Sequence, residues 1–220
     1  ARSIALANAV AIDMTTATQS KDWKARAAFL TPITKAFGTD VGMAVAELGV
    51  QVHGGMGFIE ETGAAQYSRD VRVTAIYEGT NGIQSMDLVG RKLMDGGYAA
   101  TALLDEMANF TKSCSKMKPE LCRALLRAIE GLHETTGWML QQGDFNHRFA
   151  GAVAYLRAFA RILGAYFHLR AAHAETGEGP RTRLARFYIN SLLPEYIGLL
   201  AKASQGADDL YAIKLEDLVA

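Results

Sequence analysis

The chain has 220 residues, half of them hydrophobic, and its 23 basic and 23 acidic residues give no formal net charge. This length is enough to bury a sizeable core and to form one or two domains. The charge balance gives no electrostatic basis for binding nucleic acid or an anionic membrane, and the absence of any run of about 18 uncharged apolar residues argues against a bilayer span.

Apolar residues recur at three- and four-residue steps along the whole chain, and no long segment alternates with period two. The pattern predicts an all-α protein, in which an antiparallel helical bundle over residues 1–96 is followed by a second helical module over residues 97–220. In the first bundle, helices are expected over residues 3–19, 22–52, 62–71 and 81–95. Gly96 and Gly97 should end the last of these.

The second module carries four further helical patterns with well-marked stops between them. Gly143 and Asp144 should end one helix and cap the next, and Gly177 to Pro180 should do the same before Arg181. Pro194 should bend the last long helix, because proline cannot donate a helical hydrogen bond. The tail from Asp208 is expected to form a short turn with a terminal helix or a strandlike arm.

One carboxylate lies on a glycine-rich turn just before a helix, in the segment Tyr77-Glu78-Gly79-Thr80-Asn81-Gly82. Gly79 leaves little bulk beside Glu78, so a planar ligand could come close, and Thr80 or Asn81 would cap the helix that follows. This arrangement suits a base that removes a proton. The alternative is that Glu78 is only a charge in the first turn of a helix.

A second glycine-rich segment, Gln51-Val52-His53-Gly54-Gly55-Met56-Gly57, lies upstream. It lacks the third glycine of a dinucleotide fingerprint and follows a helical pattern rather than a strand, so a Rossmann interpretation fails, and no Walker lysine follows. A helix that ends at adjacent glycines can expose backbone to a phosphate or to another chain. The alternative is a plain helix C-cap and turn, with His53 in structural contacts.

Together these segments resemble the C-terminal helical domain of the acyl-CoA dehydrogenase family. The resemblance runs from the first residues to about Lys92 and rests on residues 51–58, 69–72 and 76–80. Residues from about 100 onward resemble, in pattern and position, the extra C-terminal helical module of one long-chained branch of that family. The resemblance implies an FAD-dependent oxidoreductase that acts on acyl-CoA thioesters in fatty acid β-oxidation.

The resemblance also assigns roles to individual residues. It implies that Glu78 removes the α-proton of the substrate while the flavin accepts the β-hydrogen as hydride. Some family members take this base from an earlier helix, but this chain has a glutamate at the common place. The residues that the resemblance places at the acyl-CoA thioester are Tyr77, Glu78 and Gly79.

Two sets of residues are implied to bind FAD. Thr80, Asn81 and Gly82 match residues at the diphosphate portion of the flavin. The other set matches a loop that reaches the ADP portion of a flavin bound largely by a neighbouring subunit, and it consists of Gln51, Val52, His53, Gly54 and Gly55. A loop that serves a neighbour implies a homo-oligomer, a dimer or larger, with electron-transferring flavoprotein as the expected electron acceptor.

The family's N-terminal helical domain and middle β-domain, which complete the acyl pocket and hold the flavin ring, have no counterpart in this sequence. Since Ala1 is neither an initiating methionine nor part of a signal peptide, we expect a C-terminal part of a longer chain. Alone it should bind no FAD and be inactive. The alternatives are an oligomerisation or scaffold domain without chemistry and a relative of acyl-CoA oxidase, whereas a DNA-binding relative is disfavoured by the zero net charge.

The remaining polar motifs predict structural roles. Cys114 and Cys122 are expected to be free thiols in a cytoplasmic protein, since their spacing matches no redox or metal motif. The five histidines give no metal signature, because His168 and His173 miss the spacing that places two ligands on one helix face. The segment Arg69-Asp70-Val71-Arg72 recurs in the family, but a local ion pair that fixes a helix end is the favoured interpretation.

Overall fold

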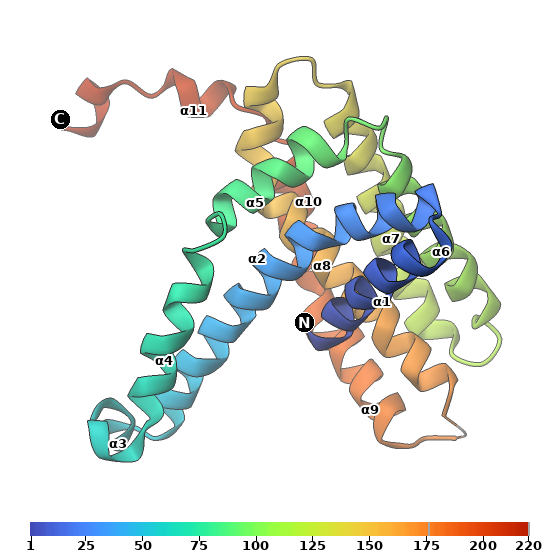
Figure 1. The fold of residues 1–220 in the computed structure, drawn as a ribbon, viewed down its shortest axis with the longest axis horizontal. Helices are drawn as coiled ribbons and strands as arrows, with labels where there is room; N and C mark the ends of the chain where they lie inside the picture. The colour runs from blue at the N-terminus through green and yellow to red at the C-terminus, as the bar shows by residue number, and fades with distance from the viewer. Residues whose placement is uncertain (176, 220) are drawn as a thin grey trace.

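The computed structural model describes residues 1–175 and 177–219, and within these ranges the chain is helical with no strand (Figure 1). The predicted all-α class is therefore confirmed. The helices of the first part of the chain are α1 (Arg2–Thr18), α2 (Lys21–Val52), α3 (Gly55–Phe58), α4 (Ala64–Arg72) and α5 (Asn81–Asp87). The helices of the second part are α6 (Tyr98–Ser113), α7 (Pro119–Gln141), α8 (Phe145–His173), α9 (Pro180–Phe187), α10 (Tyr196–Ala203) and α11 (Asp208–Ala212).

The helix ends follow from local side chains. The Ser20 hydroxyl caps α2 by accepting from the Asp22 N–H at 3.2 Å, and the Asp144 carboxylate caps α8 by accepting from the Asn146 N–H at 2.8 Å. Pro180 begins α9 at a position where its missing N–H costs nothing. The stops predicted around residues 143 and 179 are thus confirmed.

Two expected helices are interrupted. The helix predicted over residues 81–95 is α-helical only to Asp87 and then widens into a π-helical turn, Leu88–Lys92. At this turn the Phe149 ring of α8 lies 3.1 Å from where a Cβ on Gly90 would be, so the wider turn lies directly against an aromatic ring. Pro194, which was expected to bend the last long helix, lies within the 3₁₀ segment Leu193–Glu195 that interrupts this helix after a π-helical turn, Tyr188–Leu192.

The tail is helical rather than strandlike. It forms α11 and a 3₁₀ turn, Leu215–Leu218, which extend away from the helices of the body in Figure 1. Across the described residues no helix has the length and apolar content that crossing a membrane requires.

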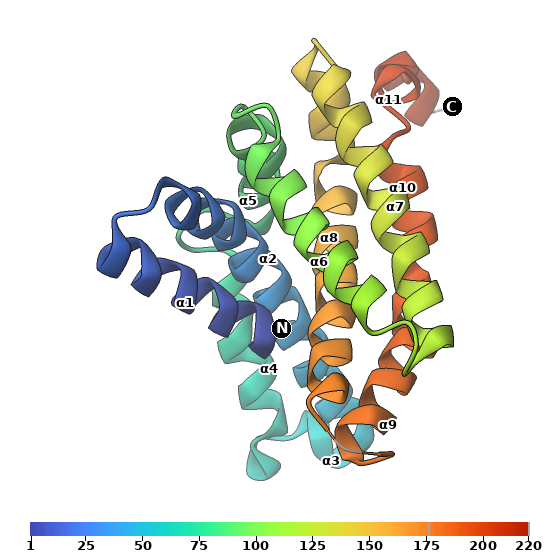
Figure 2. The ribbon, with the colours of Figure 1, turned by 90° about the vertical axis from the view of Figure 1, so that its right-hand side faces the viewer.

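Helix α8 lies at the centre of the second part of the chain and packs against α1, α2 and α5 of the first (Figure 2). Its residues from Tyr155 to Leu169 are mostly buried, and the Phe159 ring meets the Phe29 ring of α2 edge to face, with 5.0 Å between their centroids. One apolar core therefore contains side chains from both parts. The domain boundary at residues 96 and 97 stays a prediction.

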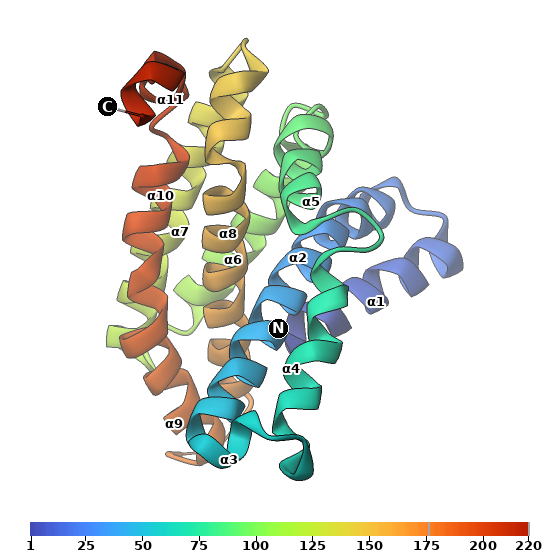
Figure 3. The same ribbon diagram turned by 90° about the vertical axis from the view of Figure 1, so that its left-hand side faces the viewer.

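A helical hairpin extends from this body (Figures 1 and 3). We call residues 42–72 the arm; it comprises the C-terminal part of α2, the short helix α3 at its tip, and α4, which returns along α2. Several large apolar side chains of the arm are exposed: Val45 62%, Leu48 62%, Val52 84%, Met56 57%, Phe58 81% and Tyr67 74%. Exposed apolar side chains that lie together mark interaction sites, and two of these, Val45 and Tyr67, line the same hollow between α2 and α4.

A polar cluster ties α2 to the second part of the chain. Arg26 of α2 donates from both terminal guanidinium nitrogens to the carboxylate of Glu106 in α6, and the Tyr166 hydroxyl of α8 donates to the same carboxylate at 2.8 Å. Burial opposes the charged form of Glu106, but the hydrogen bonds from Arg26 and Tyr166 outweigh it and hold the pKa of this carboxyl below its ordinary value.

This depressed pKa predicts a pH-dependent contribution to stability. Because the folded-state pKa lies below the unfolded one, the contribution is present above the ordinary pKa of 4.5 and is lost as the pH falls through the folded-state pKa. Glu106→Gln should lower the free energy of unfolding by about 1 kcal/mol at pH 7, since the pair is partly exposed. Urea unfolding of both proteins between pH 7 and pH 3 should show this difference shrinking; a constant difference would contradict the assignment.

Candidate active site

A groove of about 850 Å³ opens beside Glu78. Residues Thr31 and Pro32 of α2 contribute to its lining, as do Ile83 of α5 and the π-helical turn. Phe145 and Phe149 at the start of α8 contribute aromatic walls. Most of the lining surface is apolar, which suits an organic ligand more than a metal ion.

Glu78 has an unusual backbone conformation. Its φ is 57°, in the left-handed region, and the next residue, Gly79, has a φ of 80°. A non-glycine residue there costs on the order of 1 kcal/mol or more, and such residues cluster at ligand-binding and catalytic sites. The side chain is exposed at the edge of the groove.

Helix α5 begins immediately after this turn. The Thr80 hydroxyl caps it by accepting from the Ile83 N–H at 3.4 Å, so the predicted N-cap is confirmed. The Asn81 side chain turns toward α2, where its amide nitrogen lies 2.6 Å from a carboxylate oxygen of Asp40 and 2.9 Å from the Thr39 hydroxyl. Any contact of Asn81 with a flavin diphosphate would therefore have to come from its backbone.

Two side chains hold the carbonyl groups of the Glu78–Gly79 turn. The Lys35 ammonium of α2 donates to the Gly79 carbonyl at 2.6 Å and to the Asn81 Oδ1 at 3.0 Å. The Gln84 side-chain amide donates to the Glu78 carbonyl at 2.9 Å. Both carbonyls thus have donors from outside the turn, and the conformation of the turn is fixed from α2 and from α5.

The lining of the groove also carries charge at and just before the π-helical turn. Asp87 accepts from Arg91 one turn later, and the Lys92 ammonium lies 3.7 Å from the other carboxylate oxygen of Asp87. With two cations for one anion, this part of the π-helical turn favours a negatively charged ligand group.

The predicted loop Gln51–Gly55 lies at the tip of the arm. The His53 Nδ1 lies 2.8 Å from the Gly49 carbonyl, so this histidine does have the structural contact of a helix end. Gly54 has a φ of 59°, and a Cβ on Gly54 or Gly55 would meet nothing within 4 Å, so bare backbone faces open space there. Gly57, in contrast, approaches α2 so closely that its Cβ would lie 2.2 Å from the Val50 carbonyl oxygen.

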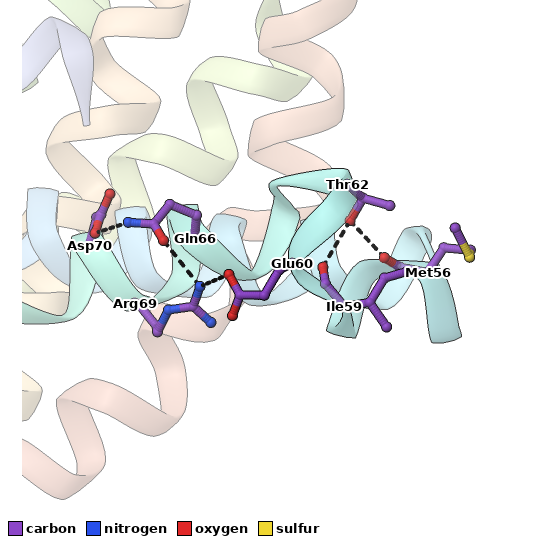
Figure 4. Close-up of polar contacts among 7 residues, drawn as sticks. All are labelled: Met56, Ile59, Glu60, Thr62, Gln66, Arg69 and Asp70. Atoms are coloured by element: carbon purple, nitrogen blue, oxygen red, sulfur yellow. Dashed lines mark hydrogen bonds and ion pairs between the residues drawn. The ribbon is translucent and has the colours of Figure 1, made fainter.

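Side chains on one side of the arm hold its tip together (Figure 4). Arg69 of α4 forms an ion pair with Glu60 at 2.8 Å, and the Thr62 hydroxyl donates to the Met56 carbonyl at 2.6 Å. Arg69 thus forms an ion pair with Glu60, outside the segment 69–72, rather than the pair within that segment that was expected. Asp70 instead accepts from Gln66, one turn earlier on α4, at 2.7 Å.

The two predicted glycine segments do not share one site within this chain. Glu78 and Gly79 line the groove against the body, whereas Gly49 and His53 line a separate hollow of about 460 Å³ between α2 and α4. Helix α4, with nine residues, separates them along the arm. Tyr77, next to Glu78, is 54% exposed.

The sequence analysis missed Lys35 and the groove-lining phenylalanines. Lys35 is a half-buried lysine of α2, close in sequence to the buried residues Ile33, Ala36 and Phe37. A lysine among buried apolar residues is the one signal that could have suggested a specific acceptor. Nothing in the sequence indicated that this acceptor is the Gly79 carbonyl.

Neither cysteine belongs to a reactive or metal-binding site. Cys114 and Cys122 are both free, as predicted, and both are buried; burial raises the pKa of the Cys122 thiol to about 11. Within the described residues, no three side chains of His, Cys, Asp or Glu gather where they could hold a metal ion.

Comparisons with known families match both parts of the chain. The family model described as acyl-CoA dehydrogenase, C-terminal domain, matches residues 2–94. A second model, described as acetyl-CoA dehydrogenase C-terminal like, matches residues 103–214. These ranges include Glu78, the arm, most of α6 and helices α7 to α11.

Curated relatives carry related names. A 3-methylmercaptopropionyl-CoA dehydrogenase of Ruegeria pomeroyi is 38% identical over 164 residues, which are 70% of this chain and 28% of the relative. A butyryl-CoA dehydrogenase of Syntrophomonas wolfei is 28% identical over 199 residues, 80% of this chain and 32% of the relative. A very long-chain specific acyl-CoA dehydrogenase of Rattus norvegicus is 36% identical over 89 residues, 40% of this chain and 13% of the relative.

In each of these relatives the matched region is less than a third of the relative's length. The matches to the two C-terminal family models adjoin along the sequence and together span most of the chain. The chain therefore belongs to the acyl-CoA dehydrogenase family, and it corresponds to the C-terminal domains of that family.

Proposed function

We propose that this chain provides the catalytic base and part of the FAD site of an acyl-CoA dehydrogenase that introduces a double bond between the α and β carbons of an acyl-CoA thioester. Glu78 is the base that takes the α-proton, and Tyr77 and Gly79 lie beside the thioester. The observation that carries this proposal is the left-handed conformation of Glu78 at the edge of the apolar groove.

The geometry around Glu78 supports a role in proton abstraction. The side chain is exposed beside the groove, where a substrate could reach it, while its backbone is held by Gln84 and Lys35. A base fixed in this way loses little freedom when it meets the substrate, which favours proton transfer. The apolar lining of the groove suits the acyl part of the ligand.

The residues present fit FAD at two places. A Cβ on Gly54 or Gly55 would meet no atom within 4 Å, so the backbone there is open to a ligand. A Cβ on Gly82 would have as its nearest neighbour the Thr80 hydroxyl at 3.9 Å. A diphosphate can approach such backbone without meeting side chains. We assign the diphosphate portion to Thr80, Gly82 and the Asn81 backbone, and the ADP portion to residues 51–55. When bound, FAD supplies the acceptor for the β-hydrogen.

Oligomerisation belongs to the same proposal. Residues 51–55 lie at the arm tip, apart from the groove of their own chain, so they would serve a flavin bound by a second copy. The exposed apolar side chains of the arm, such as Leu48 and Phe58, give it a surface for that copy. These same side chains favour a second candidate function, in which the chain acts as an assembly domain without chemistry.

Other features of the proposal concern the whole protein. We assign residues 1–96 and 97–220 to two domains of a longer chain, place the protein in the cytoplasm, and expect electron-transferring flavoprotein to reoxidise the flavin. An acyl-CoA oxidase would use the same base, but oxygen would be its acceptor. The isolated chain should bind no FAD, because a few polar contacts rarely outweigh the cost of immobilising a ligand.

The test is an anaerobic titration of the full-length flavoprotein that contains this chain. The substrates are butyryl-CoA, palmitoyl-CoA and 3-methylmercaptopropionyl-CoA, and we expect at least one to bleach the flavin absorbance stoichiometrically. Readmitted oxygen should restore the colour slowly, with little hydrogen peroxide during turnover; rapid peroxide formation would identify an oxidase. A flavin that no acyl-CoA bleaches would contradict the proposal and favour the assembly domain.

A further inference from the structure

The turn that carries Glu78 cannot hold its shape by local preference alone. Two consecutive residues have positive φ values, 57° and 80°, and only the second is a glycine. A non-glycine residue in this region persists only where the surrounding structure fixes it. The contacts that fix the turn therefore decide where the Glu78 carboxylate lies.

Lys35 is the charged group among those contacts. Its ammonium lies 2.6 Å from the Gly79 carbonyl oxygen and 3.0 Å from the Asn81 Oδ1, so it joins the residue after Glu78 to the start of α5. The Asn81 amide nitrogen in turn donates toward the Thr39 hydroxyl and the Asp40 carboxylate. Side chains of α2 thus form hydrogen bonds at both ends of the segment from Gly79 to Asn81.

Lys35 has no ion-pair partner within the described ranges 1–175 and 177–219, although it is half-buried. Both oxygen atoms that the Lys35 ammonium contacts are neutral, and one of them is the carbonyl of Gly79, the residue after the strained Glu78. Charge-assisted hydrogen bonds are about twice as strong as neutral ones, so this one is well suited to hold a strained turn.

We infer that Lys35 is a positioning residue for Glu78, fixing the left-handed turn through the Gly79 carbonyl and Asn81 so that the carboxylate faces the groove. This inference rests on the proposed function of Glu78. Lys35 itself does not contact substrate in this role. Its loss should therefore lower the rate of proton abstraction more than the binding of acyl-CoA or FAD.

The first measurement does not depend on activity. Amide hydrogen exchange is followed by mass spectrometry in the full-length protein and in Lys35→Met, with Lys24→Met as the control, because Lys24 is exposed on the same helix. We expect faster exchange in peptides that cover residues 77–84 of Lys35→Met, and unchanged exchange in peptides from α8. If Lys35→Met does not fold, Lys35→Gln takes its place.

The second measurement separates kcat from KM. Lys35→Met should lower kcat by about 10- to 100-fold, the effect of a misplaced catalytic group, with KM and FAD content within about twofold of the parent. Lys35→Arg, which keeps the charge, should recover part of the loss.

Unchanged exchange over residues 77–84, or a loss of protection throughout the protein, would overturn the inference. A parent protein that no acyl-CoA reduces would instead refute the proposed function, and the exchange result would still judge the role of Lys35.

Discussion

Replacing Glu78 with Gln in the full-length flavoprotein is expected to reduce turnover by a factor of about 100 to 10,000, the usual effect of losing a general base. The amide keeps the shape of the side chain but cannot accept the α-proton. Flavin content should stay close to that of the parent, since the diphosphate contacts we assign lie in other residues. The measurement is single-turnover bleaching of the flavin by a saturating acyl-CoA under anaerobic conditions.

The matched control is Glu134→Gln. Glu134 is an exposed carboxylate on α7, outside the groove and the arm, so its loss should leave the bleaching rate unchanged. Near-parental turnover in Glu78→Gln would show that another carboxylate is the base. Loss of flavin together with turnover would point to a structural role for Glu78 in the strained turn.

A large loss of stability is expected from Gly151→Ala in α8. A Cβ at this position would lie 2.1 Å from the Ala203 carbonyl oxygen of α10 and 2.9 Å from the Met139 Cε of α7. Backbone cannot yield as a flexible side chain can, so α10 must move away from α8. We expect the free energy of unfolding to fall by about 3 kcal/mol, a large overpacking effect, and the melting temperature by about 6–12 °C.

Gly137→Ala in α7 is the matched control. It makes the same chemical change in a neighbouring helix, but its new methyl group would meet no atom within 4 Å. Because alanine has the higher helix propensity, this variant should gain about 0.5–1 kcal/mol. Thermal unfolding followed by circular dichroism measures both variants. Equal effects would show that α8 and α10 do not approach as closely at Gly151 as described.

The helices were predictable because their signals are local. Apolar spacing indicated the helical class, and cap residues such as Thr80 and Asp144 indicated where helices begin. The π-helical turn at Gly90 was not predictable, since it packs on Phe149, which lies far along the chain. A widened turn responds to tertiary packing, and the sequence around Gly90 reads as ordinary helix.

In the candidate site, too, the residues with local sequence signals were predictable and those that depend on tertiary packing were not. Glu78 and the glycines around it could be found from a short segment. The carboxylate that suits a base and the glycine that lets a ligand come close to the backbone are neighbours in the sequence. The role of Lys35 could not, because only the packing of α2 against α5 brings its ammonium to the Gly79 carbonyl. The sequence also did not show that the Asn81 side chain is directed toward α2, which leaves only the Asn81 backbone for a cofactor.

Helix α2 runs unbroken from the core to the tip of the arm. Pro32 lies within it and removes one backbone hydrogen bond close to Lys35. From Pro32 to Val52 the helix measures about 30 Å, so a rotation of about 5° at the proline would carry the tip through about 3 Å. A displacement of that size exceeds the tolerance of a hydrogen bond. The precision with which residues 51–55 could meet a ligand therefore depends on the contacts that hold the arm in place.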